Sequence, residues 1–219
     1  MFIKNIKFIL ISVILYQTPL YSKSNTFNNF DKRNLSNYLS GIIAYENKDN
    51  TKALKFYNSS KILLNNHDLF LKRYVNSLIL ENKIIQATNI VKMNKTNKNT
   101  NFFEAYLLLV IDNIKKSNFV LAKINLDIAL DFAGKDRFNL AILESLKQYI
   151  FLFKEDKIYS EKKNFGKLST ISETFQSCYL GKKNTETLFL NLIHDNQAGY
   201  TRYAYFYLSY LLENNQNNK

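Results

Sequence analysis

Apolar residues recur along this chain with the spacing of one face of an α-helix, in segments that short polar turns separate. The clearest example lies between residues 34 and 67. Its first apolar positions follow the spacing i, i+3, i+4, i+7, i+8: Leu35, Tyr38, Leu39, Ile42 and Ile43. This spacing predicts a helix, with Asn34 as its N-cap. Turn-forming residues at 47–50 interrupt the pattern, and a second helical face starts at Ala53, so the segment is predicted to be a helical hairpin.

The two helices of this hairpin are expected to cross closely. Gly41 and Ala53 are small at the positions where the two backbones would approach each other. Tyr57 is large and can fill the space beside them.

The same rhythm continues in residues 68–94 and 102–132. Ala87 lies 34 positions after Ala53, and Ala122 lies 35 positions after Ala87. An isolated hairpin of this kind cannot bury its own apolar faces, so stacked neighbours are needed.

These residues resemble the tetratricopeptide repeat, whose period is about 34 residues. Gly41, Ala53 and Ser60 fall on the small-residue positions of that family, and Tyr57 falls on a large one. The chain departs from the family at Asn37, where a large residue is usual, and it lacks the usual closing proline.

The resemblance implies an all-α fold, a right-handed α-solenoid of about five hairpins, the last one incomplete. Three tetratricopeptide-like repeats would occupy residues 34–133. Degenerate helical pairs and a terminal helix would follow at 134–213, and a tail at 214–219. The last helix, residues 200–212, either caps the stack or belongs to the N-terminal part of a longer array.

The resemblance also implies a concave groove that binds a peptide or a helix. The groove-facing positions carried over from the family are Tyr38, Ile42, Tyr45, Leu69, Lys72, Asn76, Ile79, Leu107 and Ile111. Further positions of the same kind are Leu35, Glu46, Leu80, Glu104, Ile114 and Lys115. The alternative is that these residues face a neighbouring part of the same chain.

Some members of the family hold a peptide's C-terminal carboxylate with donors spaced like Lys72 and Asn76. Two donors four residues apart on one helical face can bind one anion. Leu108 stands where the next unit should supply an amide, so we do not expect this clamp here.

Residues 1–22 have the features of a secretory signal peptide. Lys4 and Lys7 precede the apolar run 8–16, and Ser22 is a suitable residue at a cleavage point. The run is shorter than the ~20 residues of a membrane-spanning helix. We therefore expect a periplasmic protein with a flexible lead-in at 23–33. The alternative is an uncleaved signal that anchors the protein in the inner membrane.

The chain is basic, with a formal net charge of +12. Loss of residues 1–22 removes Lys4 and Lys7 and no acidic residue, which leaves +10. Basic charge can indicate an anionic polymer or nucleic acid as partner. The lysines are dispersed rather than clustered, so we favour a solvated surface and a protein or peptide partner.

Catalytic and cofactor sites are not indicated. Cys178 is the single cysteine, and His67 and His194 are the only histidines that could activate it. Cys178 lies on an apolar helical face, which favours an inert thiol. There is no glycine-rich phosphate loop and no histidine-containing cluster for a metal. We predict a non-enzymatic interaction scaffold without a cofactor.

Overall fold

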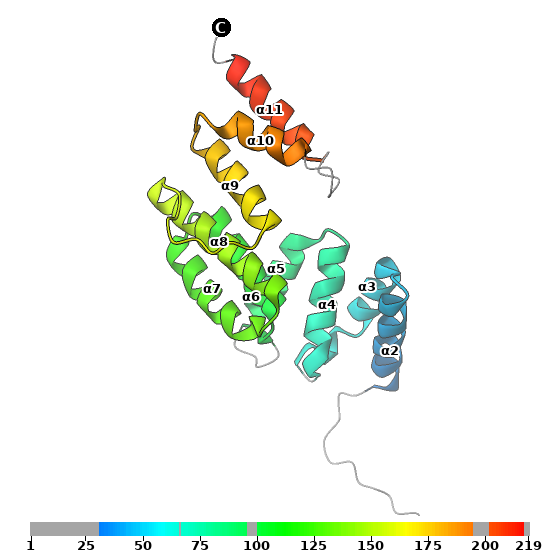
Figure 1. Ribbon diagram of the computed structural model, residues 1–219. Helices are drawn as coiled ribbons and strands as arrows, with labels where there is room; N and C mark the ends of the chain where they lie inside the picture. Colours follow the sequence, from blue (N-terminus) through cyan, green and yellow to red (C-terminus); the bar gives the residue numbers. More distant parts are fainter. Residues whose placement is uncertain (1–30, 66, 96–99, 195–201, 217–219) are drawn as a thin grey trace, which may run out of the picture.

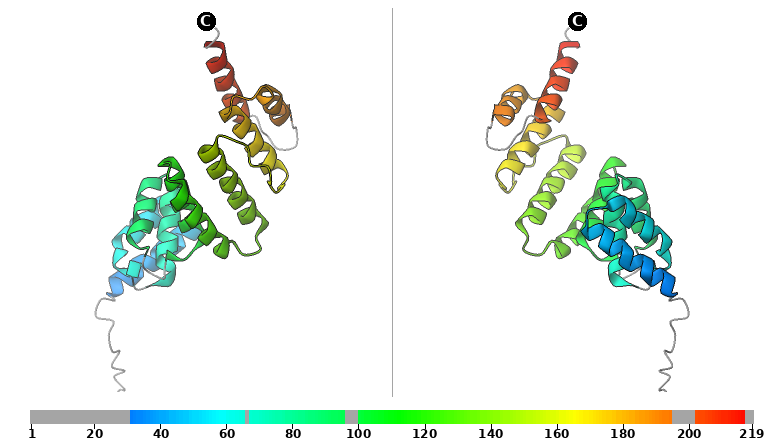
Figure 2. Two further views of the ribbon diagram at one scale, coloured as in Figure 1. Left: turned by 90° about the vertical axis from the view of Figure 1, so that its left-hand side faces the viewer. Right: turned by 90° about the vertical axis from the view of Figure 1, so that its right-hand side faces the viewer.

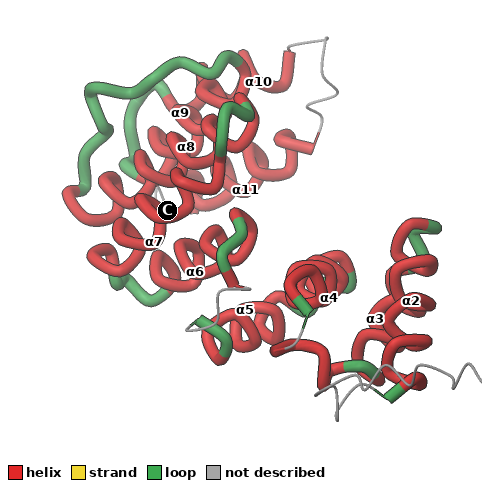
Figure 3. The backbone as a smooth tube through the Cα atoms, turned by 90° about the horizontal axis from the view of Figure 1, so that it is seen from below, coloured by secondary structure: helices red, strands yellow, loops and turns green. Residues whose placement is uncertain are grey.

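The computed structural model describes residues 31–65, 67–95, 100–194 and 202–216, and these residues form helices and turns with no strand among them (Figures 1 and 3). The predicted all-α class is thereby confirmed. Within the same residues, no helix combines the length and the apolar character that crossing a membrane requires. The predicted signal peptide, residues 1–22, lies outside the described part.

Each helix packs against the next one in the chain, from α2 to α11. In order, the elements are α2 (Lys32–Glu46), α3 (Asn50–Ser59), the short 3-10 helix η1 (Lys61–Asn65), α4 (Asp68–Leu80), α5 (Ile84–Met93), α6 (Phe103–Lys115), α7 (Phe119–Ala133), α8 (Arg137–Glu155), α9 (Lys167–Tyr179), α10 (Thr185–His194) and α11 (Arg202–Gln216). Two side views show that α2 and α11 lie at opposite ends of the molecule (Figure 2).

Two predicted boundaries need correction. Helix α2 begins at Lys32, because the Asp31 carboxylate accepts a hydrogen bond from the backbone N–H of Arg33 at 3.1 Å and acts as the N-cap. Asn34 therefore lies inside the helix, and residues 32 and 33 do not belong to the lead-in. Helix α11 extends to Gln216, three residues into the predicted tail.

Three hairpin turns repeat one backbone geometry at the predicted period. Lys48, Asn82 and Ser117 adopt left-handed φ angles of 61°, 56° and 54°. After each of them, the next backbone N–H donates to a carbonyl five residues earlier, at 2.8–2.9 Å, which closes the helix in a Schellman motif. The three turns are 34 and 35 residues apart, the same spacing as that of the three buried alanines of the hairpins.

The close crossing predicted for the first hairpin is confirmed. A Cβ atom added to Gly41 would lie 2.7 Å from Cε1 of Tyr57, which is closer than real Cβ contacts. Ala53 and Tyr57 are both fully buried. The absence of a side chain at Gly41 therefore allows the tyrosine ring to fill the space between α2 and α3.

Helices α2–α8 share one continuous apolar cluster. It includes Tyr57, Phe70, Leu78, Val91, Leu109, Leu126 and Ile150. Helices α9–α11 instead pack through aromatic rings: Phe175 of α9 meets Phe189 of α10 at 5.7 Å and Phe206 of α11 at 5.2 Å between ring centroids.

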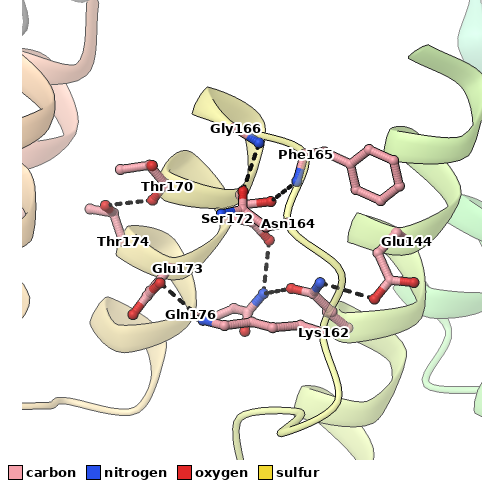
Figure 4. Close-up of polar contacts among 12 residues, drawn as sticks. Glu144, Lys162, Asn164, Phe165, Gly166, Thr170, Ser172, Glu173, Thr174 and Gln176 are labelled. Atoms are coloured by element: carbon pink, nitrogen blue, oxygen red, sulfur yellow. Dashed lines mark hydrogen bonds and ion pairs between the residues drawn. The ribbon is translucent and has the colours of Figure 1, made fainter. Parts of the chain in front are cut away.

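Buried polar side chains meet in the contact between α8 and α9 (Figure 4). Gln148 and Gln176 are buried, and Nε2 of Gln176 donates to Oε1 of Gln148 at 3.0 Å and to Oγ of Ser172 at 2.8 Å. Gln148 in turn donates to the buried Glu144 carboxylate at 3.2 Å. The backbone N–H of Lys163 also reaches that carboxylate, at 3.3 Å. The two regions of the chain thus meet across a hydrogen-bonded layer, and the rings of Phe153 on α8 and Tyr179 on α9 also meet there, at 5.0 Å between centroids.

Candidate functional site

A groove of about 530 Å³ lies between the end of α4, the first half of α5 and one face of α6. Its lining is mainly apolar. The lining residues are Ile79 from α4; Ile84, Ile85, Thr88 and Asn89 from α5; and Glu104, Leu107, Leu108, Ile111, Asp112 and Lys115 from α6. Helical periodicity places the α6 residues on one face, because they recur at intervals of three and four.

Three of the predicted groove residues meet in this groove. Ile79 comes from the second hairpin, and Leu107 and Ile111 come from the third. Glu104 and Lys115, two of the further positions named from the resemblance, lie at the same groove. The sequence reasoning thus selected side chains that the fold brings together from two hairpins.

The contribution of α5 was missed. The resemblance to the tetratricopeptide repeat places only the first helix of each unit along the concave side, so it does not indicate Ile84 and Ile85. Ile85 is 78% exposed, so this side chain lies open to solvent beside the groove. Two adjacent isoleucines at the start of a helix point about 100° apart, so one of them can lie away from the core, and that pattern was an available signal.

The prediction for Tyr38 is wrong, because this residue belongs to the core. It is 2% exposed, and its ring lies 4.7 Å from His67 and 5.4 Å from Phe70 between centroids. Nη1 of Arg73 donates to its hydroxyl group. These contacts leave no surface of the Tyr38 ring for a partner.

Three other predicted positions are separate from the groove. Ile42 and Tyr45 are partly buried and pack against the apolar cluster of the core. Leu69 is 53% exposed on α4 but does not line the groove. The structure therefore does not join the first hairpin to the groove of the second and third.

Lys72 and Asn76 also lie outside the groove lining. Nζ of Lys72 forms an ion pair with Oε1 of Glu104 at 3.3 Å and lies 5.9 Å from the centroid of the Phe102 ring. Lys72, one of the two possible donors of a carboxylate clamp, therefore already pairs with a carboxylate of the same chain. This contact links α4 to α6 beside the groove.

The acidic residues of the groove are held in ion pairs. Asp112 lies 2.5 Å from Nζ of Lys92 and 2.9 Å from Nζ of Lys116. Partial burial acts to raise the pKa of Asp112, but hydrogen bonds from the two lysines outweigh it and lower the pKa below its ordinary value. Asp112 therefore stays ionised and paired at neutral pH.

The arrangement around Cys178 does not favour a nucleophile. Burial, with a smaller contribution from the charge of Glu213, raises the pKa of the Cys178 thiol. A raised pKa reduces the thiolate fraction, which is the reactive form. Within the described residues there is no group of three or more His, Cys, Asp or Glu side chains placed to hold a metal ion.

Comparison with known proteins gives no relative for this chain. No protein-family model matches it, and neither the curated proteins nor the solved structures contain a significant match.

Proposed function

We propose that this chain is a non-enzymatic, exported interaction scaffold, built as a right-handed solenoid of tetratricopeptide-like hairpins, which binds a segment of a partner protein in the groove of α4, α5 and α6. The observation that carries the proposal is the meeting of Ile79, Leu107 and Ile111, from two successive hairpins, in one open apolar groove. Apolar grooves between helices are a common way to bind peptide segments.

The repeated hairpin geometry supports the solenoid part of the proposal. Three left-handed turn residues and three fully buried alanines recur with the same spacing of 34 and 35 residues. Each helix contacts its successor in the chain. Successive units that each contact their neighbours are the defining organisation of repeat proteins.

The exposure of the groove supports a binding role. Ile85 and Ile111 are 78% and 43% exposed, and they lie close to other apolar lining residues. Covering apolar surface of this kind contributes roughly 25 cal/mol per Å² removed from water. A contiguous exposed apolar patch is typical of an interaction site, whereas scattered apolar residues are ordinary.

Affinity capture tests the proposal. The chain from Lys23 would be immobilised and exposed to envelope extract of its own cell at low and at high salt, with mass spectrometry of the retained material. The groove variant combines Leu107→Ala with Ile111→Ala. Phe138→Ala is the matched control, because Phe138 is 70% exposed on α8 and lies outside the groove.

We expect a protein retained at both salt concentrations by the wild type and by the control, and lost from the groove variant. Retention of nucleic acid or of many acidic proteins at low salt only, unchanged in the groove variant, would contradict the proposal. That result would support the basic surface as the binding feature, since binding to polyanions weakens steeply with salt.

A further inference from the structure

We infer that the groove of α4, α5 and α6 takes an amphipathic helix of about three turns, which carries a carboxylate opposite Lys115. The inference rests on the proposed function, because it names the occupant of the same groove. Three features support it: the hydrogen bonds already made by the polar lining residues, the length of the groove, and the one charge left over in it.

Three of the five polar lining residues, Thr88, Glu104 and Asp112, already have partners within the chain. The Thr88 hydroxyl donates to the backbone carbonyl of Ile84 at 2.9 Å, and Glu104 and Asp112 are in ion pairs with lysines. Oε2 of Glu104 is buried from solvent and has no hydrogen-bond partner among the described residues. Among the described residues, only the side chains of Asn89 and Lys115 line the groove without a polar partner.

This shortage of free polar groups selects a helical occupant. An extended segment brings one N–H and one C=O per residue, and these groups need partners when they are buried. The two polar side chains that remain, Asn89 and Lys115, cannot supply partners along the whole length of an extended segment. A helix satisfies its own backbone and presents only side chains to the groove, at positions such as i, i+3, i+4 and i+7.

The length of the lining sets the length of the helix. On α6 the lining extends from Glu104 to Lys115. Eleven steps of about 1.5 Å along a helix span about 16 Å, or three turns. A partner helix packed along α6 over this distance would place about three apolar side chains against Leu107, Leu108 and Ile111.

The unpaired charge of Lys115 determines which side chain suits one end of the partner helix. Glu104 and Asp112 are each neutralised by lysines, whereas Lys115 has no anionic partner among the described residues. A carboxylate on the partner can pair with its ammonium group at the edge of the groove. A cationic partner residue would be repelled there, and the net charge of +10 on the chain from Lys23 repels cationic partners further.

Selection from a peptide library tests the inference. Random 16-residue peptides displayed on phage would be selected on the chain from Lys23 and counter-selected on the Leu107→Ala/Ile111→Ala variant. Peptides specific for the wild type would be synthesised with isotope labels. Their bound conformation would be read from NMR chemical shifts, and their Kd measured against wild type, Lys115→Glu and Lys123→Glu. Lys123 is the matched control, since it is exposed on α7 and outside the groove lining.

We expect helical peptides with apolar residues at i, i+3 or i+4, and i+7, and with Asp or Glu near one end. Lys115→Glu should weaken their binding by about tenfold, and Lys123→Glu by less than about twofold. Replacing the peptide's acidic residue by Lys should restore binding to Lys115→Glu. Two results would overturn this inference and leave the groove as a binding site: wild-type-specific peptides that bind in an extended conformation, or peptides whose Kd is the same for wild type and Lys115→Glu. Failure to obtain any peptide that distinguishes wild type from the groove variant would contradict the proposed function itself.

Discussion

Helices α2–α8 and α9–α11 are held together by different kinds of contact. The first region shares one apolar cluster that extends from α2 to α8. The second region packs through aromatic rings and joins the first across the buried glutamine pair Gln148 and Gln176. Burying apolar surface is strongly favourable, whereas a buried hydrogen bond contributes only about 1 kcal/mol net.

The groove lies in the first region, α2–α8, which the continuous apolar cluster holds together. Its walls, α4, α5 and α6, all contribute to the continuous cluster, through residues such as Leu78, Val91 and Leu109. A binding site built on rigid elements keeps its shape without a partner. The contact of α8 with α9 is expected to open at lower free energy, because each of its buried polar groups loses water and gains only its hydrogen bonds.

The largest predicted effect is in the first region. Gly41→Leu should lower the free energy of unfolding by about 3 kcal/mol, because even a Cβ atom at this position meets the Tyr57 ring at 2.7 Å. Urea denaturation would measure it. Ser36→Leu is the control on the exposed side of α2, where the same side chain should change stability by less than about 0.5 kcal/mol. Equal effects of the two substitutions would show that the close crossing is absent.

The layer between α8 and α9 can be tested with a double-mutant cycle. Gln148→Leu should cost about 1–2 kcal/mol, since it leaves a buried N–H of Gln176 without its 3.0 Å acceptor. Adding Gln176→Leu should recover the part of the loss that comes from this pair, whereas Glu144 still lacks the donor that Gln148 supplied. Additive losses in the double variant would contradict the pairing of these two side chains.

Tyr57 gives a prediction that depends on pH. Its hydroxyl is buried and has no hydrogen-bond partner among the described residues, and burial raises the pKa of Tyr57 from 10.0 to about 12. Below pH 10 the folded and unfolded states are both protonated at this group. Between pH 10 and 12 the unfolded state ionises first, so this residue reduces stability as the pH rises.

Tyr57→Phe should therefore raise stability by about 1 kcal/mol at pH 8, because no buried hydroxyl remains unpaired. The gain should be larger at pH 11, where the wild type is further destabilised. Urea denaturation of both proteins at the two pH values would measure the difference. An identical pH dependence in wild type and variant would contradict the raised pKa.

The smallest expected effect is at the first hairpin turn. Lys48 has a φ of 61°, a conformation that glycine adopts without strain. Lys48→Gly should raise the free energy of unfolding by about 0.5–1 kcal/mol in thermal or urea denaturation. Lys55→Gly, inside α3, is the contrasting control and should lower stability by about 1 kcal/mol, as glycine does within a helix. A loss of stability in both variants would argue against the left-handed turn.

Periodicity was sufficient to predict most of the helices and the close approach at Gly41, because these features depend on local spacing and on side-chain size. The exact helix ends were less predictable: Asp31 and Asn34 are both good capping residues, and only the geometry shows that Asp31 is used. The polar layer was not predicted either. Gln148 and Gln176 are 28 residues apart, and only the fold brings their two amides together.

The candidate site was predicted in part for a similar reason. Ile79, Leu107 and Ile111 lie on helical faces that the repeat spacing orients toward one another. In the first hairpin, Tyr38 occupies the position equivalent to Leu107. There, however, His67, Phe70 and Arg73 of the same chain cover the tyrosine ring. Repeat spacing predicts which side of a helix a residue lies on. It does not predict whether neighbouring side chains of the same chain fill the space in front of that residue.

The most direct test of the groove as a binding site is amide hydrogen exchange, measured by mass spectrometry on the chain with and without the protein retained at both salt concentrations. The proposed function predicts added protection in residues 79–93 and 103–115, which form the groove, and little change in α10 and α11. Protection confined to α9–α11, or spread over the lysine-bearing surface with none in α5 and α6, would contradict it.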